Sequence, residues 1–340
     1  MGDRFFSTQQ YGKETTRGSA VAATRKFIGA TVGSISADRK PRTVAENVGV
    51  RAEGMRKVVD QYLVKEALSI PEGYFQALPV LFGCGLKGGV TPSEVTPDQD
   101  DYLWNFTPSL AFGVANDPDS ITFEKGDDTQ AFETSYVMFE RIKISGQVAQ
   151  GAEPAPVAIE SEFFGRVWTP TNFTGSIAIP AVAPMNAKLS RLYLDTSWAA
   201  AGNTELENVL RSFEIDILTG VHAAFAGSGS KSFNRHKEGV IAAMLTLTLE
   251  GGSEADAIWD AFHTDPQVLQ VARLVLTGSQ IGTGTNHSLQ VTIGGMWDEV
   301  VPLAEEDRGN NLHTMVLGGL YDATSAKLLD VQVTTDRNTY

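Results

Sequence analysis

Apolar and polar residues alternate with a period of two in many short stretches of this 340-residue chain. The stretches lie at residues 213–217, 245–250, 288–293 and 329–334 in the second half, and at 121–124 and 141–144 in the first. Each places Phe, Ile, Leu or Val on one side and polar or charged residues on the other. Strands with one apolar face are typical of antiparallel sheets that cover a core on one side. The pattern therefore predicts a mostly β protein.

Two short stretches have helical spacing instead. The first holds four apolar residues at i, i+3, i+4 and i+7 after a Ser that can cap a helix, and these are Ala255, Ile258, Trp259 and Phe262 after Ser253. The second follows Pro71 and contains Tyr74, Phe75, Leu78 and Phe82. Because Pro79 lacks a backbone N–H, we expect it to kink or shorten that helix. Both helices are expected to cover a sheet.

The order strand, short helix, strand, long strand, strand occurs once in each half, with similar spacing between the last three strands. Residue identity between the halves is faint, so the repeat rests on pattern and spacing. We expect two tandem β-sandwich domains, each with one short flanking helix. The expected segments are an N-terminal arm with a first strand region (1–44), domain 1 (45–175), a linker (176–204) and domain 2 (205–340), and domain 1 carries an extra loop at 85–118.

Three stretches are expected to be irregular because they lack either period. They are the polar arm up to about Ala23, the Ala- and Pro-rich stretch Gly175–Ala187, and the loop Gly220–Gly239. The last contains Gly and Ser residues followed by basic ones. Flexible loops that project from a rigid sheet often carry binding residues.

Composition narrows the range of functions. With 27 basic and 41 acidic residues the formal net charge is −14, which argues against a protein that grips phosphate backbones. The single cysteine, Cys84, lies in an apolar run and is expected to be a small core residue in a protein made in a reducing cytoplasm. The N-terminus lacks the pattern of a signal peptide, and no apolar run is long enough to span a membrane.

No catalytic or metal-binding pattern stands out. Residues 229–232 lack the glycines of a phosphate-binding loop, and the five histidines show no paired metal spacing. Gly126-Asp127-Asp128 is expected to be a hairpin turn, and residues 305–310 a charged turn between strands. We therefore expect no enzyme activity, no cofactor and no metal.

An ordered series of short motifs resembles the major tail tube proteins of long-tailed bacteriophages (siphophages). The series opens with Tyr-Gly-Lys-Glu-Thr-Thr-Arg-Gly-Ser at 11–19 and continues with motifs at 85–92, 106–110, 126–131, 164–171, 247–250 and 319–322. It covers most of the chain, although residues 180–208 match nothing in the family.

The resemblance implies β-sandwich domains whose sheets join side by side into a barrel around a lumen, in rings that stack into a tube for DNA. The implied partners are further copies of the chain, the tape measure protein and DNA transiently in the lumen, and other tail proteins at the tube ends, in a virion tail without a membrane. With a duplicated domain a ring needs three chains, and a hexamer is the alternative. Because the chain is acidic, lumen-facing residues are expected to be negative. Lys231, Arg235 and Lys237, in the loop 220–239, are the candidates for contacts between rings.

Two other functions stay open from the sequence. A distal-tail or baseplate ring protein is a near variant of the tube protein. A receptor- or carbohydrate-binding β-sandwich would expose aromatic residues on loops, and Trp104, Trp168 and Trp198 are the candidates for that role.

Overall fold

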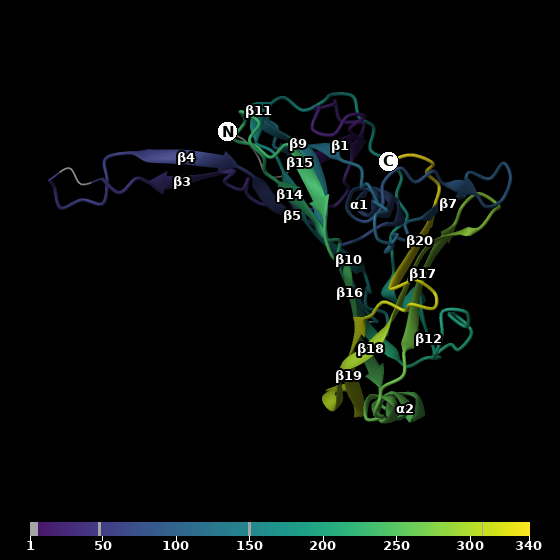
Figure 1. Cartoon of the computed structure of the whole chain (residues 1–340). Coiled ribbons are helices and arrows are strands. Elements are labelled where there is room, and N and C mark those ends of the chain that lie inside the picture. The colour runs from purple at the N-terminus through teal and green to yellow at the C-terminus, as the bar shows by residue number, and fades with distance from the viewer. Residues whose placement is uncertain (1–5, 47–48, 149–150, 308) are drawn as a thin grey trace.

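A computed structural model describes residues 6–46, 49–148, 151–307 and 309–340 of the chain. The protein is mostly β, with one large antiparallel sheet and two short α-helices, which confirms the predicted fold class at this level. The large sheet contains 16 strands, and two further hairpins have two strands each. Within the described residues the sheet does not close into a barrel, and its layers are splayed apart (Figure 1).

The first half of the chain contains the predicted strand, helix and three further strands, together with shorter elements. Its elements are β1 (Thr8–Lys13), β2 (Arg25–Lys26), β3 (Arg39–Thr43), β4 (Lys57–Tyr62), β5 (Val64–Ile70), the 3-10 helix η2 (Phe75–Ala77), α1 (Leu78–Gly85), β6 (Ser93–Glu94), β7 (Tyr102–Asn105), β8 (Ile121–Gly126), β9 (Ala131–Gln147), β10 (Val157–Gly165) and β11 (Thr169–Thr171). Pro79 is the second residue of α1 and does not kink it, because in the first turn its missing N–H has no helical partner to lose.

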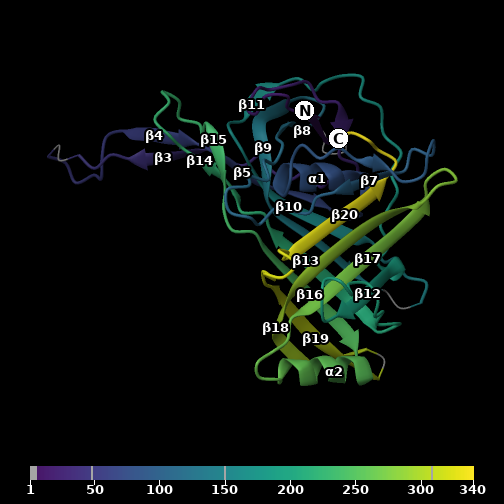
Figure 2. The same ribbon diagram turned by 45° about the vertical axis from the view of Figure 1, so that its right-hand side comes forward.

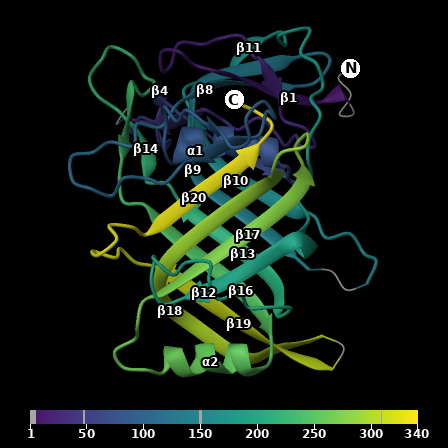
Figure 3. The same cartoon turned by 90° about the vertical axis from the view of Figure 1, so that its right-hand side faces the viewer.

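The second half repeats this succession with longer strands. Its elements are η3 (Ala187–Leu189), β12 (Ser190–Asp195), β13 (Leu210–Leu218), β14 (Val221–Ala224), β15 (Arg235–Glu238), β16 (Ala242–Glu250), α2 (Ser253–Phe262), β17 (Gln270–Gln280), β18 (Asn286–Asp307), β19 (Asn310–Gly319) and β20 (Leu329–Thr335). The turn after β8 lies where the sequence predicted it. The predicted charged turn at 305–310 is shorter than expected, because residues 305–307 end β18 and Asn310 begins β19, and residue 308 lies outside the described residues. Figure 3 shows the face formed by β17, β18 and β20, with α2 below it.

The two halves have the same order of strands in space. In the first, the hydrogen-bonded order is β5-β10-β9-β8-β1, and in the second it is β16-β19-β18-β17-β12. Corresponding strands also follow one another in the same order along the chain, and all these pairs are antiparallel. We call the two sets of strands unit 1 and unit 2.

The match extends to the segment before β5. In unit 2, β13 pairs antiparallel with β16, and the hairpin β14–β15 lies between them in the chain. In unit 1, residues 31–38 run antiparallel along β5, with Thr31 N donating to Ser69 O (2.8 Å) and Leu63 N donating to Asp38 O (2.9 Å). The hairpin β3–β4 lies between that stretch and β5. Residues 31–38, called the edge segment below, therefore correspond to β13.

Two stretches predicted to be irregular contain ordered strands. The N-terminal arm includes β1, which pairs with β8 along six residues and buries Tyr11. The loop 220–239 forms the hairpin β14–β15, and Phe233 at its end is buried against Tyr136 and Phe164. Both stretches are mostly polar, so the sequence pattern did not indicate that a few aromatic residues in them are buried and anchor them. The predicted linker also contains β12, which pairs with β17.

A large apolar core runs through both units, and a smaller cluster lies around Phe233. All eight residues of α1 are buried, including Cys84, and burial raises the pKa of its thiol. The extra loop at 85–118 contains β6 and β7, and β7 pairs with β20. A loop of unit 1 thus extends the sheet of unit 2. In the described part of the chain, neither α-helix has the length and apolarity to cross a membrane.

Candidate assembly surface

The two units are joined edge to edge through β9 and β13. Seven residue pairs connect these strands, from Ser212↔Gln147 to Leu218↔Arg141. Because β9 pairs with β10 over the same stretch, β13 lies on its other edge. Gly146 is required here, since a Cβ at this position would lie 2.7 Å from the ring of Phe213. We call this contact the unit junction.

Charges across the unit junction are complementary. Arg141 on β9 donates from Nε to Asp216 Oδ1 on β13 (2.8 Å), and Lys143 Nζ lies 2.9 Å from Glu214 Oε2. The junction therefore sets basic side chains of unit 1 against acidic side chains of unit 2. Just beyond β13, the hydroxyl of Thr219 donates to the carbonyls of Phe139 and Glu140 on β9. This hydrogen bond lies at the end of the unit junction.

The position of β18 that corresponds to the junction edge of β9 has no partner strand among the described residues. β17 and β19 both pair with Gly295, so they lie on opposite edges of β18. The residue of β17 that pairs with Gly295 is its first, Gln270, so β17 does not extend along β18 beyond this point. The side-chain amide of Gln267 then caps both N and O of Trp297, at 3.1 and 3.2 Å. From residue 298 to 304, no hydrogen bond joins this edge to another described residue. We call this stretch the open edge of β18.

The edge segment is held on one side only. The ammonium of Lys125 lies 2.7 Å from the carboxylate of Glu66 and 3.2 Å from Ser34 O, and the Glu66 carboxylate accepts the N–H of Ser36. Both charged side chains are nearly inaccessible to solvent. On the far side of residues 31–38, no strand of the described chain pairs with the segment. Unit 1 thus ends in a second open edge.

The sheet face opposite the core is acidic. Over β5, β10, β9, β13, β16, β19 and β18, acidic residues outnumber basic ones on this face. The basic residues are Lys65, Arg141, Lys143 and Arg211, and the acidic ones include Glu140, Glu160, Glu162, Glu214, Asp216, Glu250, Glu299 and Glu305. Several pair with one another across strands, so the face presents a ladder of ion pairs with an excess of carboxylates.

The three basic residues selected from the sequence lie on or beside the hairpin β14–β15. Lys231 Nζ donates to Val59 O of β4 (2.7 Å), and its own carbonyl accepts the N–H of Tyr62. Lys231 therefore fastens the base of one hairpin to the other within the chain. Arg235 and Lys237 lie on β15, are exposed, and have no ion pair with another described residue.

One cluster of possible metal ligands escaped the sequence reasoning because its members are far apart in the chain. Ligand atoms of Asp117, His236 and Glu238 lie within 4.8 Å of one another. The Glu238 carboxylate already accepts the backbone N–H groups of Asn116 and Asp117, and Asp117 pairs with Arg17 at 2.7 Å. Burial lowers the pKa of His236. The cluster therefore joins the loop before β8 to the second hairpin.

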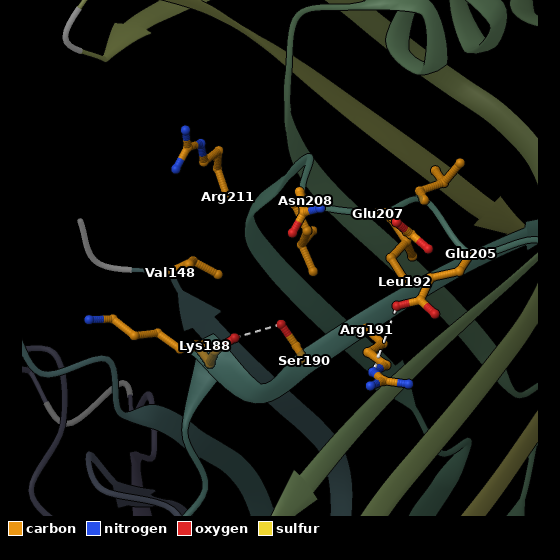
Figure 4. A pocket seen from close by; sticks show the side chains of 12 residues that line it. Val148, Lys188, Ser190, Arg191, Leu192, Glu205, Glu207, Asn208 and Arg211 are labelled. Carbon is orange, nitrogen blue, oxygen red and sulfur yellow. Dashed lines mark hydrogen bonds and ion pairs between the residues drawn. The ribbon is translucent and has the colours of Figure 1, made fainter. Parts of the chain in front are cut away.

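A groove of about 580 Å³ lies between β12, the chain after it and the start of β13 (Figure 4). Lys188 reaches backbone carbonyls, at 2.6 Å from Gly151 O and 2.9 Å from Glu153 O, and Arg191 lies 3.7 Å from Glu205. The groove lining contains no histidine or cysteine. The arrangement offers no nucleophile with an adjacent base.

No family model matches the chain, and no curated protein matches its sequence.

Proposed function

We propose that the protein is a structural protein of a bacteriophage tail, which assembles with copies of itself into rings that stack into a tube. The observation that carries the proposal is the repeated order of strands. Two units with the same topology are joined through β9 and β13, and the two edges that correspond to that junction are open at opposite ends of the chain. The ordered motifs of the sequence resemble the tail tube family and support the same function.

Open edges favour pairing with further chains. A strand with unpaired backbone groups is a template for another strand, and closed assemblies remove that hazard. Each unit contributes four successive strands to the continuous layer: the edge segment, β5, β10 and β9 in unit 1, and β13, β16, β19 and β18 in unit 2. Head-to-tail contacts between identical chains form a ring when the rotation between them closes.

The duplicated unit supports a ring of three chains. The strands place unit 1 at residues 8–171 and unit 2 at 190–335, so a trimer presents six similar units around its axis. A hexamer with one unit facing inward is the alternative. It lacks the support of the unit junction, which sets the two units side by side in one sheet.

The acidic sheet face supports a role as the lining of the lumen. A net negative lining would repel DNA weakly along its path and so would not hold it. The transient partners in the lumen would be DNA and the tape measure protein, and other tail proteins would bind at the tube ends. The protein would reside in the virion tail.

A receptor-binding function has less support from the structure. Trp104 is 2% exposed and Trp168 is 6% exposed, so neither can offer its ring to a ligand, and Trp198 packs over Gly294 with Lys327 nearby. A distal-tail ring protein differs from a tube protein in forming single rings.

Electron microscopy of the purified protein is the test of the proposed function. We expect negatively stained samples to contain rings or hollow rods of uniform width, with three chains per ring in a reconstruction. At low salt these assemblies should not bind DNA. A sample that stays monomeric at all concentrations would contradict the function, rings that never stack would favour the distal-tail alternative, and six chains per ring would refute the trimer.

A further inference from the structure

We propose that the edge segment of one chain adds as an antiparallel strand to the open edge of β18 in a second copy, and so repeats the unit junction between chains. This inference rests on the proposed function and deepens it, because it names the two surfaces that close the ring. The topology of the two units, the charges at their edges and the position of the hairpin β3–β4 support this contact.

The register of the contact follows from the strands that the units share. Matching β1 to β12 and carrying the observed pairings through β8 and β17 places residues 299–305 of β18 at the positions of residues 141–147 of β9. Carrying the pairings on to β5 in unit 1 and to β16 in unit 2 places the edge segment at the positions of residues 212–218 of β13. The pairing of β13 with β9 then predicts the pairing between chains, in which Arg39 falls opposite Asp298 of the next chain.

Charge complementarity fits this register. Arg39 and Lys40 directly follow the edge segment, and Asp298 and Glu299 begin the open edge. Neither carboxylate forms an ion pair with another described residue. The predicted register brings the two basic residues to the two acidic ones.

The proposed contact between chains places acidic residues on β18 and basic residues beside the edge segment, which is the reverse of the arrangement at the unit junction. There the basic residues lie on β9 and the acidic ones on β13. An acidic β13 is therefore poorly suited to the acidic edge of β18, and Arg39 and Lys40 after the edge segment are poorly suited to the basic residues of β9. Opposed charges of this kind favour the correct pairing by penalising the wrong one.

The hairpin β3–β4 provides independent support. Its counterpart β14–β15 follows β13 across the unit junction and packs Phe233 against Tyr136 on β9 and Phe164 on β10, which belong to the other unit. By contrast, β3–β4 projects from the body of the protein (Figures 1 and 2). Val50 and Met55 near its tip are 62% and 73% exposed. If the edge segment crosses to a second chain, this hairpin reaches unit 2 of that chain as β14–β15 reaches unit 1.

Disulfide cross-linking tests the contact. The variant Arg39→Cys/Asp298→Cys places two exposed thiols at facing positions, where Cα atoms of paired antiparallel strands lie roughly 4.5–5.5 Å apart, within disulfide range. After mild oxidation, we expect a denaturing gel without reductant to show covalent dimers and a ladder that ends at a closed trimer, which disappears on reduction. The matched control is Arg39→Cys/Val240→Cys, whose second thiol is exposed between β15 and β16 and lies off the open edge, and it should give no ladder. Cys84 is buried and does not compete.

A second measurement needs no variant. Carbodiimide treatment of the wild-type assembly should join Lys40 to Asp298 or Glu299, and mass spectrometry of the peptides should identify the bond. Tubes that form normally but give neither cross-link would overturn the proposed contact and leave the proposed function intact. Cross-linked rings in samples that never form tubes would support the contact and contradict the tube function. Monomers without any cross-link would contradict both.

Discussion

Replacing Lys125 by Met should lower the free energy of unfolding by about 3–5 kcal/mol, the usual cost of leaving a buried charge without its partner. The side chains of Lys125 and Glu66 are 4% and 6% exposed, and their charged atoms lie 2.7 Å apart. Without the ammonium, the Glu66 carboxylate keeps only the N–H of Ser36 as a described partner. Urea unfolding followed by circular dichroism measures the change.

A double variant separates the free-energy cost of the unpaired charge from the cost of lost packing. Lys125→Met/Glu66→Leu removes both charges and leaves apolar side chains of similar size, so it should recover most of the stability lost in the single variant. The exposed pair Arg42–Asp60 in the projecting hairpin is the control, since Arg42→Met should change stability by less than about 1 kcal/mol. A loss in the double variant as large as in the single one would show that the ion pair is not the cause.

This pair also connects stability to assembly, because it lies beneath the edge segment. Ser34 O and Ser36 N both bond to these two side chains. The Lys125→Met variant should therefore lose tube formation at temperatures where it is still folded. Light scattering during assembly, compared with circular dichroism of the same sample, tests this expectation.

The sequence predicted the type of most core strands because one-sided burial imposes a period of two. Leu245, Leu247 and Leu249 alternate with polar residues and are buried in β16 as expected. The partners of these strands were not predictable in the same way. β13 pairs with a strand about 70 residues earlier in the chain, and nothing in the local pattern of either strand specifies the other.

The open edges could not be predicted from the periodicity of apolar residues, and the reason is physical. The edge segment, Thr-Val-Gly-Ser-Ile-Ser-Ala-Asp, contains no fully buried residue, so burial imposes little alternation on it. Its role becomes visible only through its position beside β5. The basic residues chosen from the sequence lie nearby, on the second hairpin, but they were selected for composition. The lone Phe233 between Ser232 and Asn234 was the available signal that this loop is anchored.

Reversing the charges at the open edge should abolish assembly while leaving the fold unchanged. In the variant Asp298→Lys/Glu299→Lys, the two new ammonium groups would face Arg39 and Lys40 of the next chain. Each exposed ion pair contributes about 0.2–1 kcal/mol, so exchanging two attractions for two repulsions should cost roughly 2 kcal/mol at each contact. That is about a 30-fold weaker association at every contact, compounded around a closed ring.

Both positions are exposed, so the monomer should unfold at the same urea concentration as the wild type. Sedimentation velocity should show monomers at concentrations where the wild type forms rings. The matched control is Asp98→Lys/Glu207→Lys, which makes the same change of net charge at two exposed positions in loops away from the open edge and should still assemble. Adding Arg39→Glu/Lys40→Glu to the first variant restores opposite charges with exchanged positions, and rings should form again. Failure of this rescue, in a variant that is still folded, would mean that these four side chains do not meet across the contact between chains.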